Sequence, residues 1–199
     1  MEEARGWADA NLGIKACLGF GVREDTTEIE ELRAAVGDEC RLMVDGVWRY
    51  NLGEAVRVGR AFERNGVDFL ESPLMPEDVI GHARLCDTLD IAIAIGEPLR
   101  TRFQFLPWFT SRALTICQPD VMRNGVSETV KIATLAESFN IPVAPHIGCP
   151  TVVGMAATWQ TAAALPDLLV REFQPVMLET FNPWLVEHRD RSGPLRPRC

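Results

Sequence analysis

The chain has 199 residues, a formal net charge of -8 and 47% hydrophobic residues, which is the composition of an ordinary globular protein. This acidic balance argues against non-specific nucleic-acid binding and against docking on anionic membranes, since both need clustered lysine and arginine. The most apolar run, 91–95, is far shorter than the about 20 residues of a membrane span. The six cysteines form no CxxC pair, so we expect a reduced, cytoplasmic protein without a disulfide framework or a zinc site.

Short apolar runs alternate with helix-like segments along the whole chain. We expect seven strands, at 13–18, 42–44, 69–70, 91–95, 114–117, 141–144 and 168–170. Most of these runs are apolar throughout, which is typical of parallel strands buried on both faces. We expect helices at 28–36, 52–64, 127–139 and 152–165, and a less regular segment at 100–112 that Pro107 interrupts. Asn51 and Glu54 have the spacing of a capping box at the start of the second helix.

The even alternation of strands and helices predicts an α/β protein with parallel crossovers. No GxGxxG follows the first strand, so the fingerprint of a dinucleotide site is missing. A (β/α) TIM-type barrel fits better, although 199 residues are few for an eight-stranded barrel of typically about 250. We therefore expect an incomplete barrel domain over residues 1–187 and a disordered Arg- and Pro-rich tail over residues 188–199.

One ionisable residue follows each of six successive predicted strands. These residues are Asp45, Glu71, Glu97, Asp120, His146 and Glu172. The steps between them are 26, 26, 23, 26 and 26 residues, so each strand–helix unit contributes one such group. In a barrel the carboxyl ends of the strands converge on one mouth. A single acid after a strand is usually a helix N-cap or a solvated loop residue, but six repeats of the pattern favour a functional cluster.

Two kinds of chemistry are combined in this cluster. Asp45, Glu71 and Glu97 offer three carboxylates from adjacent strands, which is a hard oxygen site suited to Mg²⁺ or Mn²⁺ rather than zinc. His146 follows the strand next to that of Asp120, and a carboxylate beside a histidine fixes its tautomer and stabilises its protonated form. We expect this pair to act as a general base or acid, with a structural loop histidine as the alternative.

Six motifs carry a resemblance to a known family. They are Leu42-Met43-Val44-Asp45-Gly46, Leu70-Glu71-Ser72-Pro73-Leu74, Ile95-Gly96-Glu97, Gln118-Pro119-Asp120-Val121-Met122-Arg123-Asn124-Gly125, Ala144-Pro145-His146 and Arg171-Glu172-Phe173. Over roughly residues 10 to 178 the chain resembles the barrel domain of the enolase superfamily, in the mandelate racemase/muconate lactonizing enzyme branch. The resemblance implies that the three carboxylates of the predicted metal site bind Mg²⁺.

The resemblance also implies roles for the remaining residues of the cluster. Asp120 and His146 would form the general base or acid dyad, and Glu172 would hydrogen-bond the substrate carboxylate and the developing enolate. Such a role suits a neutral acid, so we expect neighbouring carboxylates to raise the pKa of Glu172.

One departure from the branch bears on the reaction. The branch carries Lys-x-Lys on its second strand, whereas this chain has Lys15-Ala16-Cys17. Racemisation needs a base on each face of the substrate and dehydration needs only one. We therefore expect an acid-sugar (aldonate or aldarate) dehydratase, a lyase. Lys15 would hold the substrate carboxylate or serve indirectly, with a solvated lysine at the strand end as the alternative. A racemase, an epimerase, a cycloisomerase and a truncated, non-catalytic barrel fragment stay open as alternatives.

Further expectations concern the whole protein. The capping domain and first strand of the branch are not recognisable in this chain, so we expect both to be absent from it. The partner is expected to be a small-molecule carboxylate, a sugar acid, with no nucleic acid and no membrane, and the full-length form to be a homo-oligomer. His82 lies in a polar helical stretch, so we expect it to be exposed.

Overall fold

The computed structural model describes residues 6, 13–148 and 151–174, in which strands and helices alternate. The strands are β1 (Ile14–Cys17), β2 (Leu42–Asp45), β3 (Val67–Glu71), β4 (Ala92–Ile95) and β5 (Ile116–Cys117). The helices are α2 (Val22–Val36), α3 (Leu52–Arg64), α4 (Val79–Thr88), α5 (Arg102–Thr110), α6 (Val121–Asn124), α7 (Val126–Glu137) and α8 (Val152–Ala162). This order confirms the predicted α/β class.

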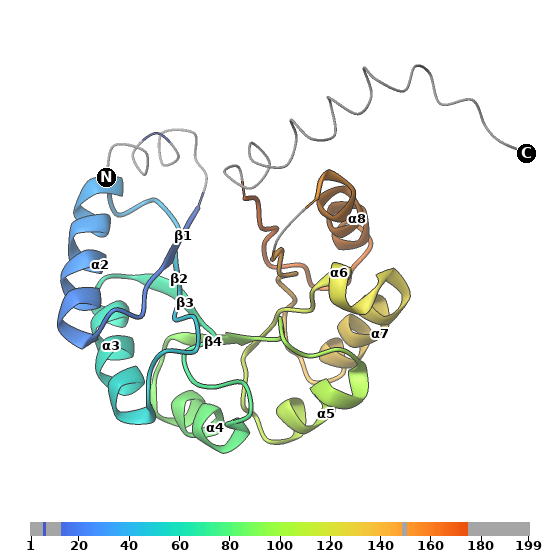
Figure 1. The fold of residues 1–199 in the computed structure, drawn as a ribbon, viewed down its shortest axis with the longest axis horizontal. Coiled ribbons are helices and arrows are strands. Elements are labelled where there is room, and N and C mark those ends of the chain that lie inside the picture. The colour runs from blue at the N-terminus through green and yellow to red at the C-terminus, as the bar shows by residue number, and fades with distance from the viewer. Residues whose placement is uncertain (1–5, 7–12, 149–150, 175–199) are drawn as a thin grey trace, which may run out of the picture.

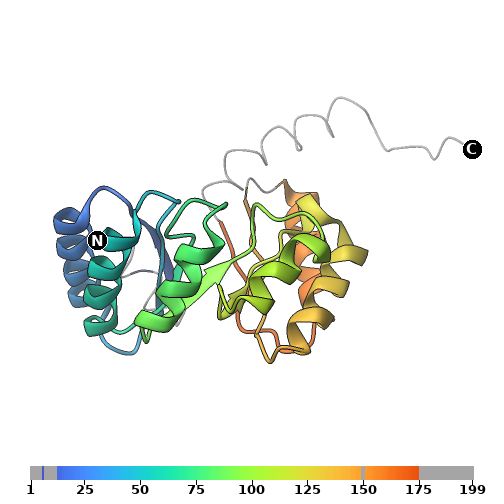
Figure 2. The same cartoon turned by 90° about the horizontal axis from the view of Figure 1, so that it is seen from below.

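The strands form one parallel sheet in the order β1-β2-β3-β4-β5. Helices lie outside the curved sheet in an arc, with β1 and α2 near one end and α8 at the other (Figure 1). The view turned by 90° shows the blue and teal helices α2 and α3 on one flank and the orange α8 on the opposite flank (Figure 2). The arrangement is that of a partial (β/α) barrel, as the sequence predicts.

The strands are apolar on both faces because each face packs against a different core. Leu42, Val44 and Leu70 are fully buried in the large cluster that includes the helices. The residues between them along the strands, Met43 and Phe69, belong to a second cluster with Ala94, Ile116 and Ala144. Since successive side chains of a strand point to opposite faces, both faces of β2, β3 and β4 are packed, as expected for a barrel, while β1 at the edge of the sheet is only half-buried.

Several helix boundaries follow from capping chemistry. The predicted capping box of α3 is present, because the Asn51 side chain accepts a hydrogen bond from the Glu54 nitrogen and Glu54 accepts one from the Asn51 nitrogen. α2 begins at Val22, six residues earlier than predicted. The buried Asp25 carboxylate accepts hydrogen bonds from the backbone nitrogens of residues 19–21 and thereby fixes the turn before the helix.

The predicted strands at 141–144 and 168–170 join the sheet only through isolated parallel bridges. These bridges are Cys117↔Val143, Asp120↔His146 and Val143↔Leu168. Pro142 and Pro145 have no N–H to donate. A continuous hydrogen-bond ladder therefore cannot form along residues 141–146, although the segments keep their predicted places.

Two further expectations have definite outcomes. His82 is fully buried, so its predicted exposure is wrong. Its ring packs edge-on against Trp108 with 5.1 Å between centroids, and its Nδ1 lies 2.7 Å from the Asp78 carbonyl oxygen. Within residues 13–148 and 151–174, no helix combines the length and apolar character needed to cross a membrane. The predicted tail at 188–199 lies outside the described residues.

Candidate active site

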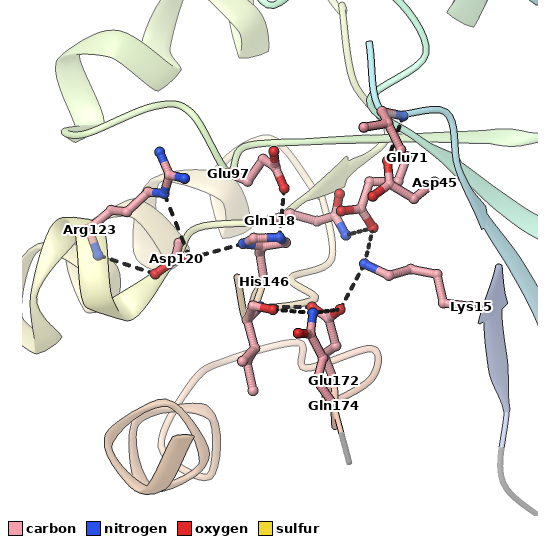
Figure 3. A network of polar contacts seen from close by, with 12 residues as sticks. Lys15, Asp45, Glu71, Glu97, Gln118, Asp120, Arg123, His146, Glu172 and Gln174 are labelled. Atoms are coloured by element: carbon pink, nitrogen blue, oxygen red, sulfur yellow. Dashed lines mark hydrogen bonds and ion pairs between the residues drawn. The ribbon is translucent and has the colours of Figure 1, made fainter. Parts of the chain in front are cut away.

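The predicted cluster assembles at the carboxyl ends of the strands. Asp45 and Glu71 are the last residues of β2 and β3 and face each other in register. Glu97 follows β4 by two residues, and Asp120 and His146 are joined by a parallel bridge. Figure 3 shows these residues with Lys15 and Glu172 around one centre. The structure therefore brings the six strand-end residues and Lys15 together, although they span most of the chain.

His146 is held between two carboxylates. Its Nδ1 lies 2.9 Å from Asp120 Oδ2, and its Nε2 lies 2.6 Å from Glu97 Oε2. Asp120 is oriented by its own backbone, because its Oδ1 accepts hydrogen bonds from the nitrogens of Met122 and Arg123 as the N-cap of α6. Burial alone would lower the pKa of His146, but the hydrogen bonds to Asp120 and Glu97 outweigh burial and raise its pKa to about 10.

Lys15 lies on β1, the first strand of the sheet, and contacts Glu71 of β3 and Glu172 near the other end of the described chain. Its Nζ lies 2.7 Å from Glu71 Oε2 and 2.9 Å from Glu172 Oε1, and its side chain is 16% exposed. Burial alone would lower the pKa of this lysine, but the charges of Glu71 and Glu172 outweigh burial and raise it. Lys15 is therefore a half-buried cation shared by two carboxylates.

Glu172 does not have the pKa that the sequence predicts. Burial favours the neutral acid, but the charges of Lys15 and His146 outweigh it and lower the pKa of Glu172 below its ordinary value. The carboxylate also accepts a hydrogen bond from the Ile147 nitrogen at 2.7 Å. The expectation of a raised pKa is wrong, because the nearest groups to Glu172 are a cation and an N–H donor rather than other carboxylates.

The centre carries more acids than bases. Figure 3 shows five carboxylates, those of Asp45, Glu71, Glu97, Asp120 and Glu172, around Lys15 and His146, with Arg123 3.9 Å from Asp120. Burial and the charge of Glu71 raise the pKa of Asp45 to about 7. Glu71 is fully buried, and its Oε1 has no hydrogen-bond partner within the described part of the chain. A buried carboxylate oxygen without a donor, in a cluster with excess negative charge, fits a divalent cation.

The donor atoms nearest to one another differ from the predicted metal triad. Glu71, Glu97 and His146 each place one ligand atom within 4.8 Å of the others. Asp45 is not one of these three, although it lies beside Glu71 in strand register. Its Oδ1 accepts a hydrogen bond from the Val47 nitrogen at 2.9 Å.

Two glutamines of the site do not stand out in the sequence. The Gln118 amide donates to Glu71 Oε2 at 2.8 Å, and the Gln174 amide donates to Glu172 Oε1 at 3.1 Å and to the Ile147 carbonyl. Both are neutral and carry no chemical signature of their own. Gln118 is the first residue of the motif 118–125 that carries the family resemblance, but nothing in the sequence assigns it a role. The signal for Gln174 is its position, two residues after Glu172.

The comparison with known families agrees with this geometry. A family model described as "Enolase C-terminal domain-like" matches residues 2–198. The chain belongs to the enolase superfamily, in its mandelate racemase/muconate lactonizing enzyme branch. The predicted resemblance is thereby confirmed, and the arc of strands and helices is part of an enolase-superfamily barrel domain.

Similar enolase-superfamily proteins have different reactions in their names. D-galactarolactone cycloisomerase of Agrobacterium fabrum is 35% identical over 86% of this chain and 47% of its own length. Arabinonate dehydratase of Saccharolobus solfataricus is 33% identical over 77% of this chain and 41% of its own length. A racemase from Streptomyces coelicolor with bound magnesium superimposes with a TM-score of 0.79 at 28% identity, covering 86% of this chain and 47% of its own. The chain thus spans less than half the length of these relatives.

Proposed function

We propose that this chain is the barrel part of a Mg²⁺-dependent acid-sugar dehydratase that abstracts the proton α to a carboxylate. The observation that carries the proposal is the Asp120–His146 pair, held at 2.9 Å beside a buried cluster of carboxylates. Abstraction of a proton α to a carboxylate requires a positioned base and a positive charge that stabilises the carbanion. The histidine would be the base, and a cation held by the carboxylates would supply the charge. Names of similar proteins, a dehydratase and a cycloisomerase, support a sugar acid or its lactone as the substrate class.

Asp45, Glu71 and Glu97 would hold the cation, because they supply hard oxygen donors from three adjacent strands. A bound Mg²⁺ supplies positive charge that stabilises the enolate of a carboxylate substrate. Lys15 would bind the substrate carboxylate, and Glu172, which contacts its ammonium group at 2.9 Å, would orient it. The roles of these residues are part of the proposal.

His146 would exchange protons through Nε2, since Asp120 holds Nδ1 at 2.9 Å. A cation bound by Glu97 would take up the carboxylate that lies 2.6 Å from Nε2, and would remove a charge that raises the pKa of the ring. The α C–H bond breaks, the proton passes to Nε2, and the electron pair enters the enolate of the substrate. The enolate then expels the β-hydroxyl group, which takes a proton from the imidazolium and leaves as water. The enol that remains tautomerises to a 2-keto-3-deoxy acid. Atoms and charge balance without an external oxidant or reductant.

The last residue of β1, Cys17, supports a reaction that uses a single base. Cys17 follows Lys15 by two residues, and its side chain is exposed rather than hydrogen-bonded to the cluster. The Lys15 ammonium group is engaged by two carboxylates. A cycloisomerase uses the same proton abstraction without loss of a hydroxyl group, and the 35% identity to a named cycloisomerase makes it the second candidate.

The experiment is to incubate the complete gene product with Mg²⁺ and a panel of aldonic and aldaric acids and galactarolactone. A dehydratase forms 2-keto-3-deoxy acids, detected as new carbonyl compounds that have lost one water by mass. A cycloisomerase acting on galactarolactone instead gives a product of unchanged mass in H₂O, because the ring oxygen that leaves the β-carbon stays in the molecule. Absence of both products, with the cation shown to bind by a rise in melting temperature, would overturn the proposal.

The setting of the enzyme is also proposed. Cys17, Cys86 and Cys117 are free thiols, which supports a reducing compartment and hence the cytoplasm. A homo-oligomeric full-length protein with no nucleic-acid or membrane partner is the form that we propose, in line with the acidic net charge of -8.

A further inference from the structure

Glu71 receives two side-chain donors on one oxygen and none on the other. Its Oε2 accepts from Lys15 Nζ at 2.7 Å and from Gln118 Nε2 at 2.8 Å. Its Oε1 is buried without a hydrogen-bond partner within the described residues. Two donors on the same oxygen fix the rotation of the carboxylate group and leave Oε1 as the oxygen that could take a cation.

The second of these donors, Gln118, follows a strand that is two places away from the strand of Glu71 in the sheet. Glu71 ends β3 and Gln118 follows β5, so β4 lies between their strands. Gln118 is only 3% exposed, and its amide therefore reaches Glu71 inside the protein, as Figure 3 shows. Residues of β3 and β5 are not paired with each other. In a barrel, however, inward-pointing side chains of alternate strands share a layer, which brings the two side chains within reach of each other.

Gly96, at the end of β4, makes this reach possible. A Cβ on Gly96 would lie 2.5 Å from the Gln118 carbonyl oxygen and 2.9 Å from its nitrogen, closer than real Cβ contacts. The backbone of Gly96 has φ +157°, a region that residues with side chains rarely adopt. Gln118 consequently packs directly on the backbone of β4, with its nitrogen donating to the Ile95 carbonyl oxygen at 2.9 Å.

We propose that Gln118 is a positioning residue for the cation site, which acts by holding the Glu71 carboxylate so that Oε1 faces the ion. The proposal rests on the proposed function, since it presumes that Glu71 is a cation ligand. The amide suits this task because it donates a hydrogen bond without adding charge. A lysine or arginine there would compete with the cation, and an aspartate or glutamate would repel Glu71.

The test is a titration of the 199-residue chain with Mn²⁺ and with Mg²⁺, followed by calorimetry and by melting temperature. Gln118→Met keeps the length of the side chain and removes its donor. We expect its cation dissociation constant to rise about 10- to 100-fold, the usual effect of losing a group that orients a metal ligand. The melting temperature without cation should fall by no more than it does in the control variant below, because one buried hydrogen bond is lost and methionine fills the same volume.

Two further variants separate positioning from general damage. Gln118→Asn keeps the amide but is one methylene too short to reach Glu71, so we expect the same loss of affinity. Thr158→Val removes another buried side-chain hydrogen bond, the 2.9 Å contact from Thr158 to the Gly154 carbonyl oxygen in α8. This control should lose stability and keep its affinity for the cation.

Each outcome has a clear reading. Weaker cation binding in both Gln118 variants, with affinity kept in Thr158→Val, supports the proposal. Unchanged cation affinity in Gln118→Met, while the unmodified chain binds Mn²⁺, overturns the role of Gln118 and leaves the proposed function standing. Failure of the unmodified chain to bind either cation overturns both.

Discussion

The two halves of the barrel segment hold their reactive side chains by different means. From β1 to β4 the strands are paired in parallel, with one register irregularity between β2 and β3. This pairing carries Lys15 on β1 and places Asp45 and Glu71 at the ends of β2 and β3. Beyond β5 the sheet continues only through isolated bridges, and there Asp120 and Glu172 are held by hydrogen bonds from backbone nitrogens to their carboxylates. We infer that the regular half is suited to binding a cation and the irregular half to transferring protons.

This difference has a physical reason. A cation site needs ligands fixed relative to one another, and neighbouring strands of a ladder supply a fixed spacing. A proton-transfer group also needs a partner that sets its tautomer, which Asp120 provides for His146 at 2.9 Å. Pro119, Pro142 and Pro145 interrupt the ladder in this half, so side-chain contacts replace strand pairing there. Four changes test the contrast.

The largest effect is expected for Glu71→Gln in the regular half. The change keeps the shape of the side chain and removes a charge that Lys15 and the proposed cation both use. Turnover should fall by about 10⁴-fold or more, since a catalytic cation contributes several kcal/mol to transition-state stabilisation. The rise in melting temperature on adding Mg²⁺ should vanish as well, which differential scanning fluorimetry measures.

A matched control lies on the same strand. Asp68→Asn removes a carboxylate of β3 that pairs with Arg41 near the other end of the strand. This variant should keep its activity and its response to Mg²⁺. If Glu71→Gln also kept the response, Glu71 would not be a cation ligand and the role assigned to the regular half would be wrong.

His146→Asn is the corresponding change in the irregular half. Asparagine cannot exchange the α-proton, so turnover should fall by about 10²- to 10⁴-fold, the usual contribution of a general base. The melting temperature should still rise with Mg²⁺, because the three carboxylates of the predicted site are untouched. Loss of turnover with retention of the Mg²⁺ response would separate the two halves in one measurement. Loss of both would show instead that His146 belongs to the cation site, next to Glu97.

The next prediction concerns the pH dependence of stability, to which the buried His82 of the regular half contributes. Burial outweighs the neighbouring Asp78 and lowers the pKa of His82 below its ordinary value of 6.5. The folded protein therefore binds a proton at His82 less readily than the unfolded chain does, so folding is favoured above pH 6.5 and loses stability as the pH falls below it. Between pH 7.5 and about 5.5 the melting temperature should fall by several degrees more than in His82→Leu, which cannot titrate.

That comparison has its own control built in. Carboxylates elsewhere titrate equally in both proteins, so only the difference between the two pH profiles reports on His82. Parallel profiles would mean that His82 does not titrate differently in the folded and unfolded states. The site would be little affected, since His82 packs against Trp108 and the Asp78 carbonyl rather than against the carboxylate cluster.

The sequence predicts the strands of the regular half better than those of the irregular half. It also predicts which residues lie in the site better than it predicts their pKa values. Apolar runs and the 26-residue steps are enough to place Asp45, Glu71 and Glu97 at strand ends, because strand pairing is local and repetitive. The strands near Val143 and Leu168 are predicted as continuous, although the two prolines of residues 141–146 prevent a ladder.

Properties that depend on three-dimensional neighbours could not be read from the sequence. The low pKa of Glu172 follows from its contact with Lys15, 157 positions away in the chain. The reach of Gln118 to Glu71 depends on a missing Cβ at Gly96, which no spacing rule indicates. The burial of His82 depends on how α4 packs against Trp108 of α5.

The smallest effect tests a strain that the regular half carries beside its metal site. Val47 follows Asp45 by two residues and adopts φ 50°. A β-branched residue is strongly disfavoured in this left-handed region, whereas asparagine tolerates it. The Val47 nitrogen nevertheless donates to Asp45 Oδ1 at 2.9 Å, so the strained turn orients a proposed cation ligand.

Val47→Asn should relieve this strain without disturbing that hydrogen bond, because the donor is a backbone nitrogen. A strained backbone conformation of this kind costs about 1–3 kcal/mol. We expect the free energy of unfolding to rise by about 0.5–1 kcal/mol, because the substitution relieves this strain but also removes the half-buried contacts of the valine side chain. For a chain of this size the melting temperature should rise by about 2 °C. The same substitution at Val153, a 73% exposed residue of α8, should change it little. An unchanged affinity for Mg²⁺ in Val47→Asn would mean that the hydrogen bond alone orients Asp45, whereas a weaker affinity would mean that the strained conformation itself is needed to hold the carboxylate in place.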